Sequence, residues 1–296
     1  MRLGGMDLHP AAHPGNFFDG GTDVEDPDRD RRPRIVLERD DSTGTERWAM
    51  ERRLAYEDEV HGIFLVPDVL GHFRTDLASV PAIFTWLVPK TGKHLAPALV
   101  HDALVHDRLR PQLYRGQHID RVAADEVFRR AMRDSGTATG RRWLVWSAVT
   151  LGTIKDGSEE WSRGQHLRYA LTALGTLVVI AALGVVATLD LADVVAWLPW
   201  MGESRSFALE LVGGLAGAIV IPLLLAATWG RFWIAGAITG VALAVLLHAT
   251  VLLGAITLGY QAVEWVARRR PMAVLVTSGL VVAAFAVLTV LLVGSS

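Results

Sequence analysis

The stretch "YALTALGTLVVIAALGVVATL" (residues 169–189) contains no charged residue, and it divides the chain into two different parts. Nearly every Asp, Glu, Lys and Arg of the 296-residue chain lies before it, whereas the remainder is mostly Ala, Val, Leu, Ile and Gly. About 20 helical residues cross the ~30 Å hydrocarbon core of a bilayer. The sequence therefore predicts a polar N-terminal part followed by a membrane region.

Further apolar segments follow the first one. We predict four spans, at about residues 169–189, 208–230, 232–260 and 271–293. A buried helical domain of a soluble protein would show amphipathic faces, whereas these segments are apolar all round. We therefore expect residues 161–296 to form an all-α, four-span transmembrane region that binds the lipid bilayer.

The basic residues that flank the predicted spans bear on the orientation of this region in the membrane, and they give two conflicting signals. Lys155, Arg163 and Arg168 precede the first span, and no apolar signal peptide begins the chain, which favours a cytoplasmic N-terminal domain on a bacterial inner membrane. The triple arginine at residues 268–270 would lie on the opposite side and argues for the reverse.

Charge and cysteine content exclude several function classes. The formal net charge of -2 lacks the basic excess of a nucleic-acid footprint, so we expect no nucleic-acid partner. The absence of cysteine rules out disulfides, thiol catalysis and zinc held by thiolates.

The polar part divides into a tail and a domain. Residues 1–33 are rich in Gly, Pro and charge of both signs, which predicts a disordered tail. Residues 34–160 are expected to form a soluble α+β domain, in which short runs rich in Val, Ile, Trp, Tyr and Phe indicate one small antiparallel sheet. We expect helices at about 94–109 and 118–134 and a third, shorter than a span, around "GRRWLVWSAVTLGTI".

The first of these helices carries a repeated dipeptide. In "LAPALVHDALVHDRL" (residues 95–109), His101-Asp102 recurs as His106-Asp107, about 140° away around the helix, so the two pairs cannot point into one site. On the next helix, Asp125 lies at the edge of the apolar arc while its charged neighbours share the opposite face. If the two helices pack together, His101 and Asp125 could meet.

Such a pair has two readings. A histidine held by a carboxylate is a general base with a fixed tautomer, and an adjoining Asp that faces away can bind a hard cation through oxygen. An inward Asp can also simply cap a neighbouring helix or pair with an arginine.

Three blocks of sequence resemble a family of unknown function, DUF1353, found in phage and bacterial genomes. They are "VPDVLGHFRTDLASVP", "APALVHDALV" and "ADEVFRRAM", and the resemblance covers about residues 47–151. Val105 stands where the family has Tyr, so a hydroxyl at that place would have to come from another residue, such as Tyr114.

The order of the His-Asp and Ala-Asp blocks also resembles phospholipases A2. That resemblance implies that His101 activates water, that Asp125 orients His101 and that Asp102 binds calcium. The glycine-rich calcium loop of those enzymes has no match, and we expect Asp76 with nearby carbonyls to supply the remaining ligands. The leading hypothesis is a membrane-anchored, metal-assisted hydrolase of lipid or envelope esters. The alternative is a non-enzymatic structural or assembly module that binds phage or cell-envelope components.

Overall fold

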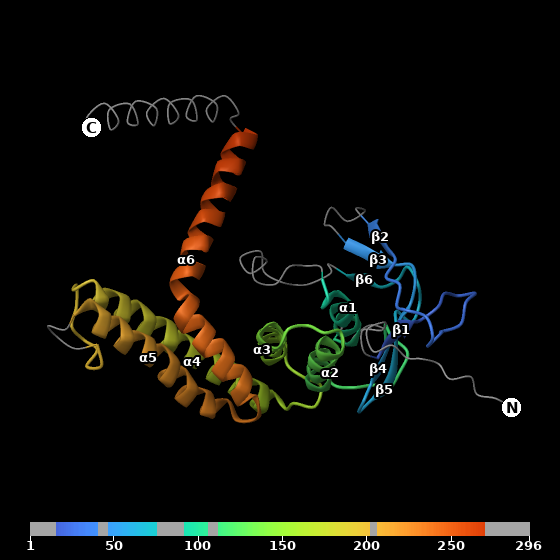
Figure 1. Ribbon diagram of the computed structural model, residues 1–296, viewed down its shortest axis with the longest axis horizontal. Helices are drawn as coiled ribbons and strands as arrows, with labels where there is room; N and C mark the ends of the chain where they lie inside the picture. Colours follow the sequence, from blue (N-terminus) through green and yellow to red (C-terminus); the bar gives the residue numbers. More distant parts are fainter. Residues whose placement is uncertain (1–15, 41–46, 76–91, 106–111, 202–205, 270–296) are drawn as a thin grey trace. The chain divides into compact units, whose positions relative to one another are not determined.

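The computed structural model describes residues 16–40, 47–75, 92–105, 112–201 and 206–269 (Figure 1). The chain separates into two units, Met1–Val245 and Leu246–Ser296, and each is described by itself. The first unit contains both sheets and most of the helices, and the described part of the second unit is the C-terminal portion of helix α6 (Trp233–Arg269).

The N-terminal part contains two antiparallel sheets of three strands each, where one sheet was expected. The first sheet has the order β1-β4-β5 and consists of β1 (Phe17–Asp19), β4 (Leu54–Asp58) and β5 (Gly62–Val66). The second has the order β2-β3-β6 and consists of β2 (Leu37–Asp40), β3 (Arg47–Met50) and β6 (Arg74–Thr75).

The division between the sheets follows from two inward-facing arginines between β3 and β4. Both oxygens of the Asp19 carboxylate accept hydrogen bonds from Arg52, at 2.6 and 2.5 Å. Arg53 donates to Asp23 and to the carbonyl of Asp68. Because both guanidinium groups turn inward, the run "RWAMERRLAYE" breaks into two strands, each of which joins a different sheet.

The expected disordered tail is wrong for residues 16–33. Strand β1 pairs with β4 along the whole of Phe17–Asp19, and the Phe17 side chain is buried in the core. Burial of an aromatic ring and the Arg52–Asp19 contacts offset the entropy of ordering this polar segment. Residues 1–15, the rest of the expected tail, lie outside the described residues.

Three helices follow the strands: α1 (Leu95–Leu104), α2 (Arg121–Asp134) and α3 (Thr139–Asp156). Helix α2 ends at Asp134, as predicted, and Gly136 just beyond it has a φ of 72°, which suits glycine. There the N–H of Thr137 donates to Met132 and that of Gly136 to Arg133, which satisfies the last carbonyls of the helix. One hydrophobic core joins both sheets to the buried faces of α1 and α2.

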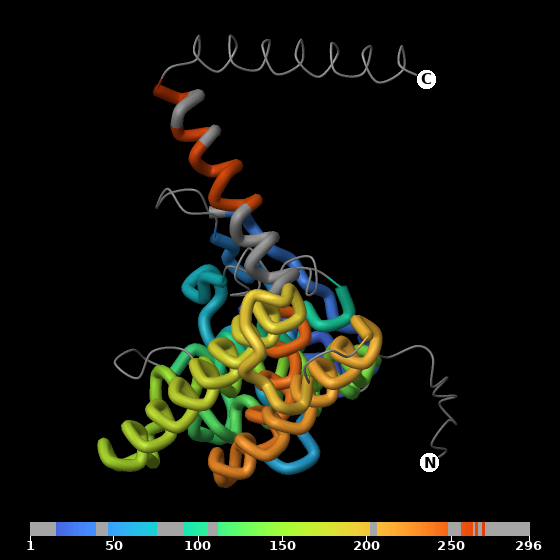
Figure 2. The backbone as a smooth tube through the Cα atoms, turned by 90° about the vertical axis from the view of Figure 1, so that its left-hand side faces the viewer, coloured from blue at the N-terminus to red at the C-terminus, as the bar shows by residue number. Residues whose placement is uncertain are grey.

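The apolar C-terminal part forms helices α4 (Arg163–Leu191), α5 (Phe207–Ala226) and α6, with a short 3₁₀ helix, η2 (Ala227–Phe232), between α5 and α6. Gly230, with φ of 59°, breaks the helix there. Helix α4 packs along α5, as both views of the chain show (Figures 1 and 2). The start of α6 lies close to α5 and α4 at Gly240. A Cβ added to this glycine would lie 2.9 Å from Pro222 of α5 and 3.0 Å from Ile180 of α4.

The number of spans differs from the four expected. Within the described residues, two helical segments are long and apolar enough to cross a bilayer, Arg163–Leu191 and Phe207–Leu247. The expected second and third spans fall within one of them, because η2, with its break at Gly230, joins α5 to α6 without a polar loop. The fourth expected span, residues 271–293, lies outside the described residues.

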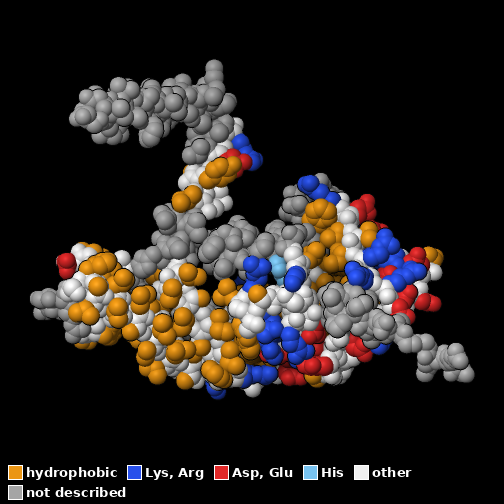
Figure 3. All heavy atoms as spheres, viewed as in Figure 1, with side chains coloured by type: hydrophobic (Ala, Val, Ile, Leu, Met, Phe, Trp, Pro, Cys, Tyr) orange, Lys and Arg blue, Asp and Glu red, His pale blue; other side chains and the backbone are white. Residues whose placement is uncertain are grey.

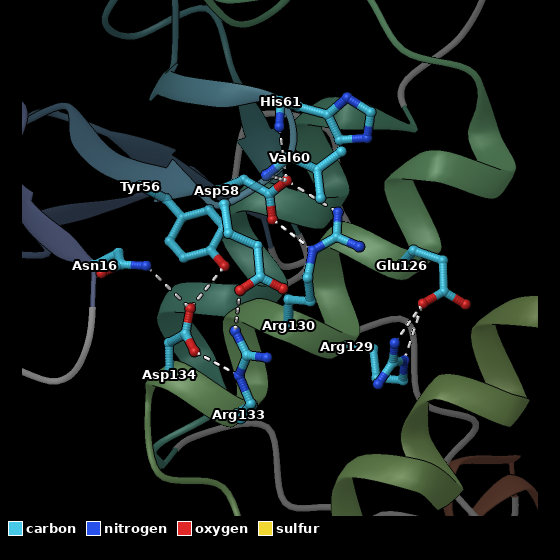
Figure 4. A network of polar contacts seen from close by, with 11 residues as sticks. Asn16, Tyr56, Asp58, Val60, His61, Glu126, Arg129, Arg130, Arg133 and Asp134 are labelled. Atoms are coloured by element: carbon cyan, nitrogen blue, oxygen red, sulfur yellow. Dashed lines mark hydrogen bonds and ion pairs between the residues drawn. The ribbon is translucent and has the colours of Figure 1, made fainter.

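A buried ion pair fixes α2 against the β4–β5 hairpin (Figure 4). Arg130 donates to both oxygens of Asp58, at 2.7 and 2.9 Å, and the Asp58 side chain is 0% exposed. Asp58 also accepts the backbone N–H groups of Val60 and His61. Burial alone raises the pKa of Asp58, but the hydrogen bonds and charge of Arg130, with those two N–H groups, hold it below its usual value.

We predict that Arg130→Met destabilises the N-terminal part by about 3–5 kcal/mol, because it leaves the Asp58 carboxylate buried without a counter-charge. The double variant Asp58→Asn, Arg130→Met should be more stable than Arg130→Met alone, because it leaves no buried charge without a partner. Amide hydrogen exchange of β4, β5 and α2 in the detergent-solubilised chain measures both changes.

The matched control is Arg29→Met, which breaks an exposed pair with Glu57 and should cost less than about 1 kcal/mol. The Asp58 contribution should be present above about pH 4, the usual value for an unfolded Asp, and be lost as the pH falls through the lower folded pKa. An Arg130→Met variant as stable as Arg29→Met would contradict this assignment.

Candidate functional site

The candidate site lies where helices α1 and α2 pack against each other. Leu99, Val100 and Ala103 of α1 share the core with Ala124 and Val127 of α2. Both helices are therefore held by apolar contacts on their inner faces. These contacts determine which polar side chains of α1 and α2 meet.

His101 and Asp125 meet across this helix pair. The distance from His101 Nε2 to Asp125 Oδ1 is 2.8 Å, so the contact expected from the helical projection is present. Asp125 is 2% exposed, which confirms that it faces inward while Arg129 and Arg130 pair elsewhere on the helix. The histidine side chain is 13% exposed, so solvent reaches only part of the ring.

The contact determines the proton positions on the ring. An ionised carboxylate only accepts hydrogen bonds, so with Asp125 ionised the Nε2 atom of His101 carries the proton that it donates. In the neutral ring, Nδ1 then has the lone pair and is the atom that can accept a proton. The pair therefore has the arrangement of a general base whose tautomer is set by a carboxylate.

Phe128 is a further part of the site, although the sequence patterns gave it no role there. Its ring stacks on that of His101, with centroids 4.6 Å apart and an angle of 24° between the planes. Phe128 follows Asp125 by three residues and so lies on the same side of α2. It holds the imidazole from one face while Asp125 holds it at the edge.

Asp125 carries one unusual feature. Its second oxygen, Oδ2, is buried and has no hydrogen-bond partner among the described residues. A buried carboxylate oxygen without a partner is costly, so such atoms are commonly found where a water molecule or a ligand completes the structure.

The expected calcium ligands are only partly described. Asp102 lies on α1 next to His101, whereas Asp76 falls outside the described residues. Calcium takes six to eight oxygen ligands, and the described residues contain no group of three or more His, Asp or Glu side chains that could hold a metal. The described part of the chain therefore does not supply a calcium site by itself.

Tyr114 and the second His-Asp dipeptide, which the sequence analysis also considered, do not contribute to the described site. Tyr114, considered as a substitute for the Tyr replaced by Val105, is buried in the core with its ring edge-on to Phe64, 5.7 Å between centroids. This contact makes Tyr114 part of the β5 packing. The second dipeptide, His106-Asp107, lies outside the described residues.

Residues 48–149 match the model of a protein family of unknown function, DUF1353. The match covers the last four strands, helices α1 and α2 and most of α3, and so includes His101, Asp125 and Phe128. Comparison with curated proteins and with solved structures found no match.

We predict that, in the neutral ring, His101 carries its proton on Nε2. In ¹⁵N spectra of the histidine-labelled chain, the His101 signals should show this tautomer, and Asp125→Ala should shift them toward a mixture of both tautomers. The signals are assigned by their loss in His101→Gln. A proton on Nδ1 in the unmodified protein would contradict the geometry described above.

Proposed function

We propose that this chain is a membrane-anchored hydrolase of lipid or envelope esters, in which His101 is the general base. The observation that supports it is the 2.8 Å contact between His101 Nε2 and the buried carboxylate of Asp125. A histidine fixed at once by a carboxylate and by a stacked ring has the defined orientation that acid–base chemistry needs.

The proposed reaction is direct attack of water on the ester. Nδ1 of His101 takes a proton from water as the water oxygen bonds to the carbonyl carbon, forming a tetrahedral intermediate. The bond from this carbon to the alkoxy oxygen then breaks, and the imidazolium returns its proton to the leaving alkoxide. The products are a carboxylic acid and an alcohol, and the base is regenerated. The Asp125 carboxylate stabilises the imidazolium in between.

The membrane anchor is supported by the surface of α4 and α5. In the most apolar part of each candidate span only 11% of the residues are buried. Figure 3 shows apolar side chains gathered over these helices, whereas charged side chains gather over the sheets and α1–α3. Exposed apolar side chains of this extent need a non-aqueous environment. The α4 helix of 29 residues is about 43 Å long, enough to cross the hydrocarbon core.

The finer assignment has three parts. The turn at Gly230 makes α5 and the start of α6 a hairpin that crosses the bilayer and returns. The membrane is a bacterial inner membrane, with the N-terminal domain on the cytoplasmic side. Calcium would supply Lewis-acid polarisation of the ester carbonyl, with Asp102 and Asp76 among its ligands.

The alternative is a non-enzymatic module of the phage or cell envelope. It is favoured by the small exposure of His101 and by the fact that its contact with Asp125 also ties α1 to α2. In that case the pair contributes to stability only, and its replacement changes folding without any catalytic readout.

We predict that His101→Ala lowers ester hydrolysis by about 10²–10⁴-fold, because it removes the proton acceptor. Asp125→Asn should leave a residual rate, because it disturbs only the tautomer and orientation of the base. Fatty-acid release is measured with the full chain in mixed phospholipid vesicles, and with water-soluble esters, at several calcium concentrations. Asp102→Asn should be partly rescued by added calcium, whereas His101→Ala should not.

His118→Ala is the matched control, because His118 also contacts a carboxylate, that of Glu159 at 3.2 Å, but 67% of its side chain is exposed. This variant should hydrolyse esters at the unmodified rate. Equal losses in His118→Ala and His101→Ala, or no hydrolysis by the unmodified chain on any ester, would favour the non-enzymatic alternative.

The membrane anchor can be tested by labelling single introduced cysteines, because the chain has no cysteine of its own. In spheroplasts, a membrane-impermeant maleimide should label Val194→Cys from outside and Gly164→Cys only after lysis. Leu174→Cys, at an exposed position within α4, should stay unlabelled in both because no thiolate forms in hydrocarbon. Labelling of Leu174→Cys after lysis without detergent would show that α4 lies in water.

A further inference from the structure

The start of α4 and the η2 turn come together in a cluster of basic and aromatic side chains, which we call the collar. It consists of Arg163, Arg168, Arg231, Trp161, Tyr169 and Phe232. These residues come from two chain segments separated by about the length of two spans. Their meeting shows that the start of α4 and the α5–α6 turn lie at the same end of the apolar helices.

The aromatic side chains hold the collar together. The Trp161 ring lies 4.9 Å from Tyr169 and 5.6 Å from Phe232, and the last two are 5.1 Å apart, all between centroids. Beneath them, the indole N–H of Trp229 donates to Thr176 at 2.9 Å. Phe232 also packs in a cluster with Val122 of α2 and Ile154 of α3, which joins the collar to the N-terminal domain.

The three arginines of the collar are exposed, and two of them, Arg168 and Arg231, lie over these rings. Arg168 is 5.7 Å from the Tyr169 centroid, and Arg231 is 5.5 Å from that of Phe232. An added Cβ on Gly230 would lie 3.9 Å from Arg168 Nη2, so the Arg168 guanidinium reaches the turn that carries Arg231. Among the described residues, none of the three collar arginines pairs with a carboxylate, and the carboxylate of Asp156, at the end of α3, pairs with Arg121.

The opposite end of the same helices has the opposite character. Asp190, Asp193 and Glu210 lie there, and the described residues 186–201 and 206–215 contain no Lys or Arg. Asp190 is buried and accepts the N–H groups of Trp197 and Leu198. Among the described residues of α4, η2 and α5, guanidinium groups therefore lie only at the collar end.

We propose that the collar binds the phosphate groups of anionic phospholipids in the leaflet that faces the N-terminal domain. Guanidinium groups form paired hydrogen bonds with phosphate oxygens, and Trp and Tyr rings favour the depth of the lipid head groups. The exposed Trp233 beside Arg231 extends the aromatic surface at this depth. Anionic lipids are concentrated on the cytoplasmic leaflet, so the collar would also fix the orientation of the chain. This inference rests on the membrane anchor of the proposed function and is independent of hydrolysis.

The test compares the thermal unfolding of the full chain in nanodiscs of phosphatidylcholine with that in nanodiscs containing a third phosphatidylglycerol. The anionic lipid should raise the midpoint of the unmodified chain, and Arg168→Gln with Arg231→Gln should remove most of this gain. Arg168→Lys with Arg231→Lys should keep part of it, since the charge remains. Raised salt should reduce the gain, because it screens exposed charges.

The matched control is Arg268→Gln with Arg269→Gln, which removes the same charge at the end of α6. Arg268 pairs with Glu264 and Arg269 lies 4.2 Å over the Trp265 ring, so this variant should keep the full gain. Inorganic phosphate in place of anionic lipid should give no gain. An equal gain in the two Gln variants, or none in the unmodified chain, would overturn the proposal while leaving the anchor intact. Failure of the chain to enter either disc would overturn both.

Discussion

The buried ion pair between Asp58 and Arg130 sets the position of α2, and the candidate site depends on that position. Arg130 is on the side of α2 that faces the β4–β5 hairpin, whereas Asp125 faces α1. A charge without exposure to water must keep its partner, so α2 cannot rotate without a large cost in free energy. The same constraint that holds the helix on the sheet therefore directs the Asp125 carboxylate to His101.

Within the first unit, packed side chains join the His101–Asp125 pair to the apolar helices. Helix α2 carries Asp125 and Phe128, and one turn earlier its Val122 packs with Phe232 of the η2 turn. If His101 of α1 acts as a base, held by Asp125 of α2, it lies on a domain that is joined to the apolar helices by packed side chains. That arrangement suits ester substrates that reside in or at a bilayer, because the domain is held where such substrates are concentrated.

Local patterns predicted the helices and the inward direction of Asp125, because both depend on periodicity within one segment. The division into two sheets could not be predicted in this way. It depends on Arg52 and Arg53 turning inward to acidic residues some 30 positions earlier, in a segment whose composition is typical of disorder. Phe128 was visible in the sequence as part of the apolar arc, but its contact with His101 requires the packing of α1 on α2. In the described residues the expected second and third spans form one apolar segment, because η2 joins α5 to α6 without a polar loop.

The central claim is that His101, fixed by Asp125, acts on an ester. The most direct measurement is an experimental structure of the full chain with a phosphonate analogue of a phospholipid ester. The phosphonyl group should lie within about 3 Å of His101 Nδ1, with Nε2 still in contact with Asp125. An analogue bound away from His101, or an Nδ1 atom enclosed by protein side chains with no access from the lipid or the solvent, would contradict it.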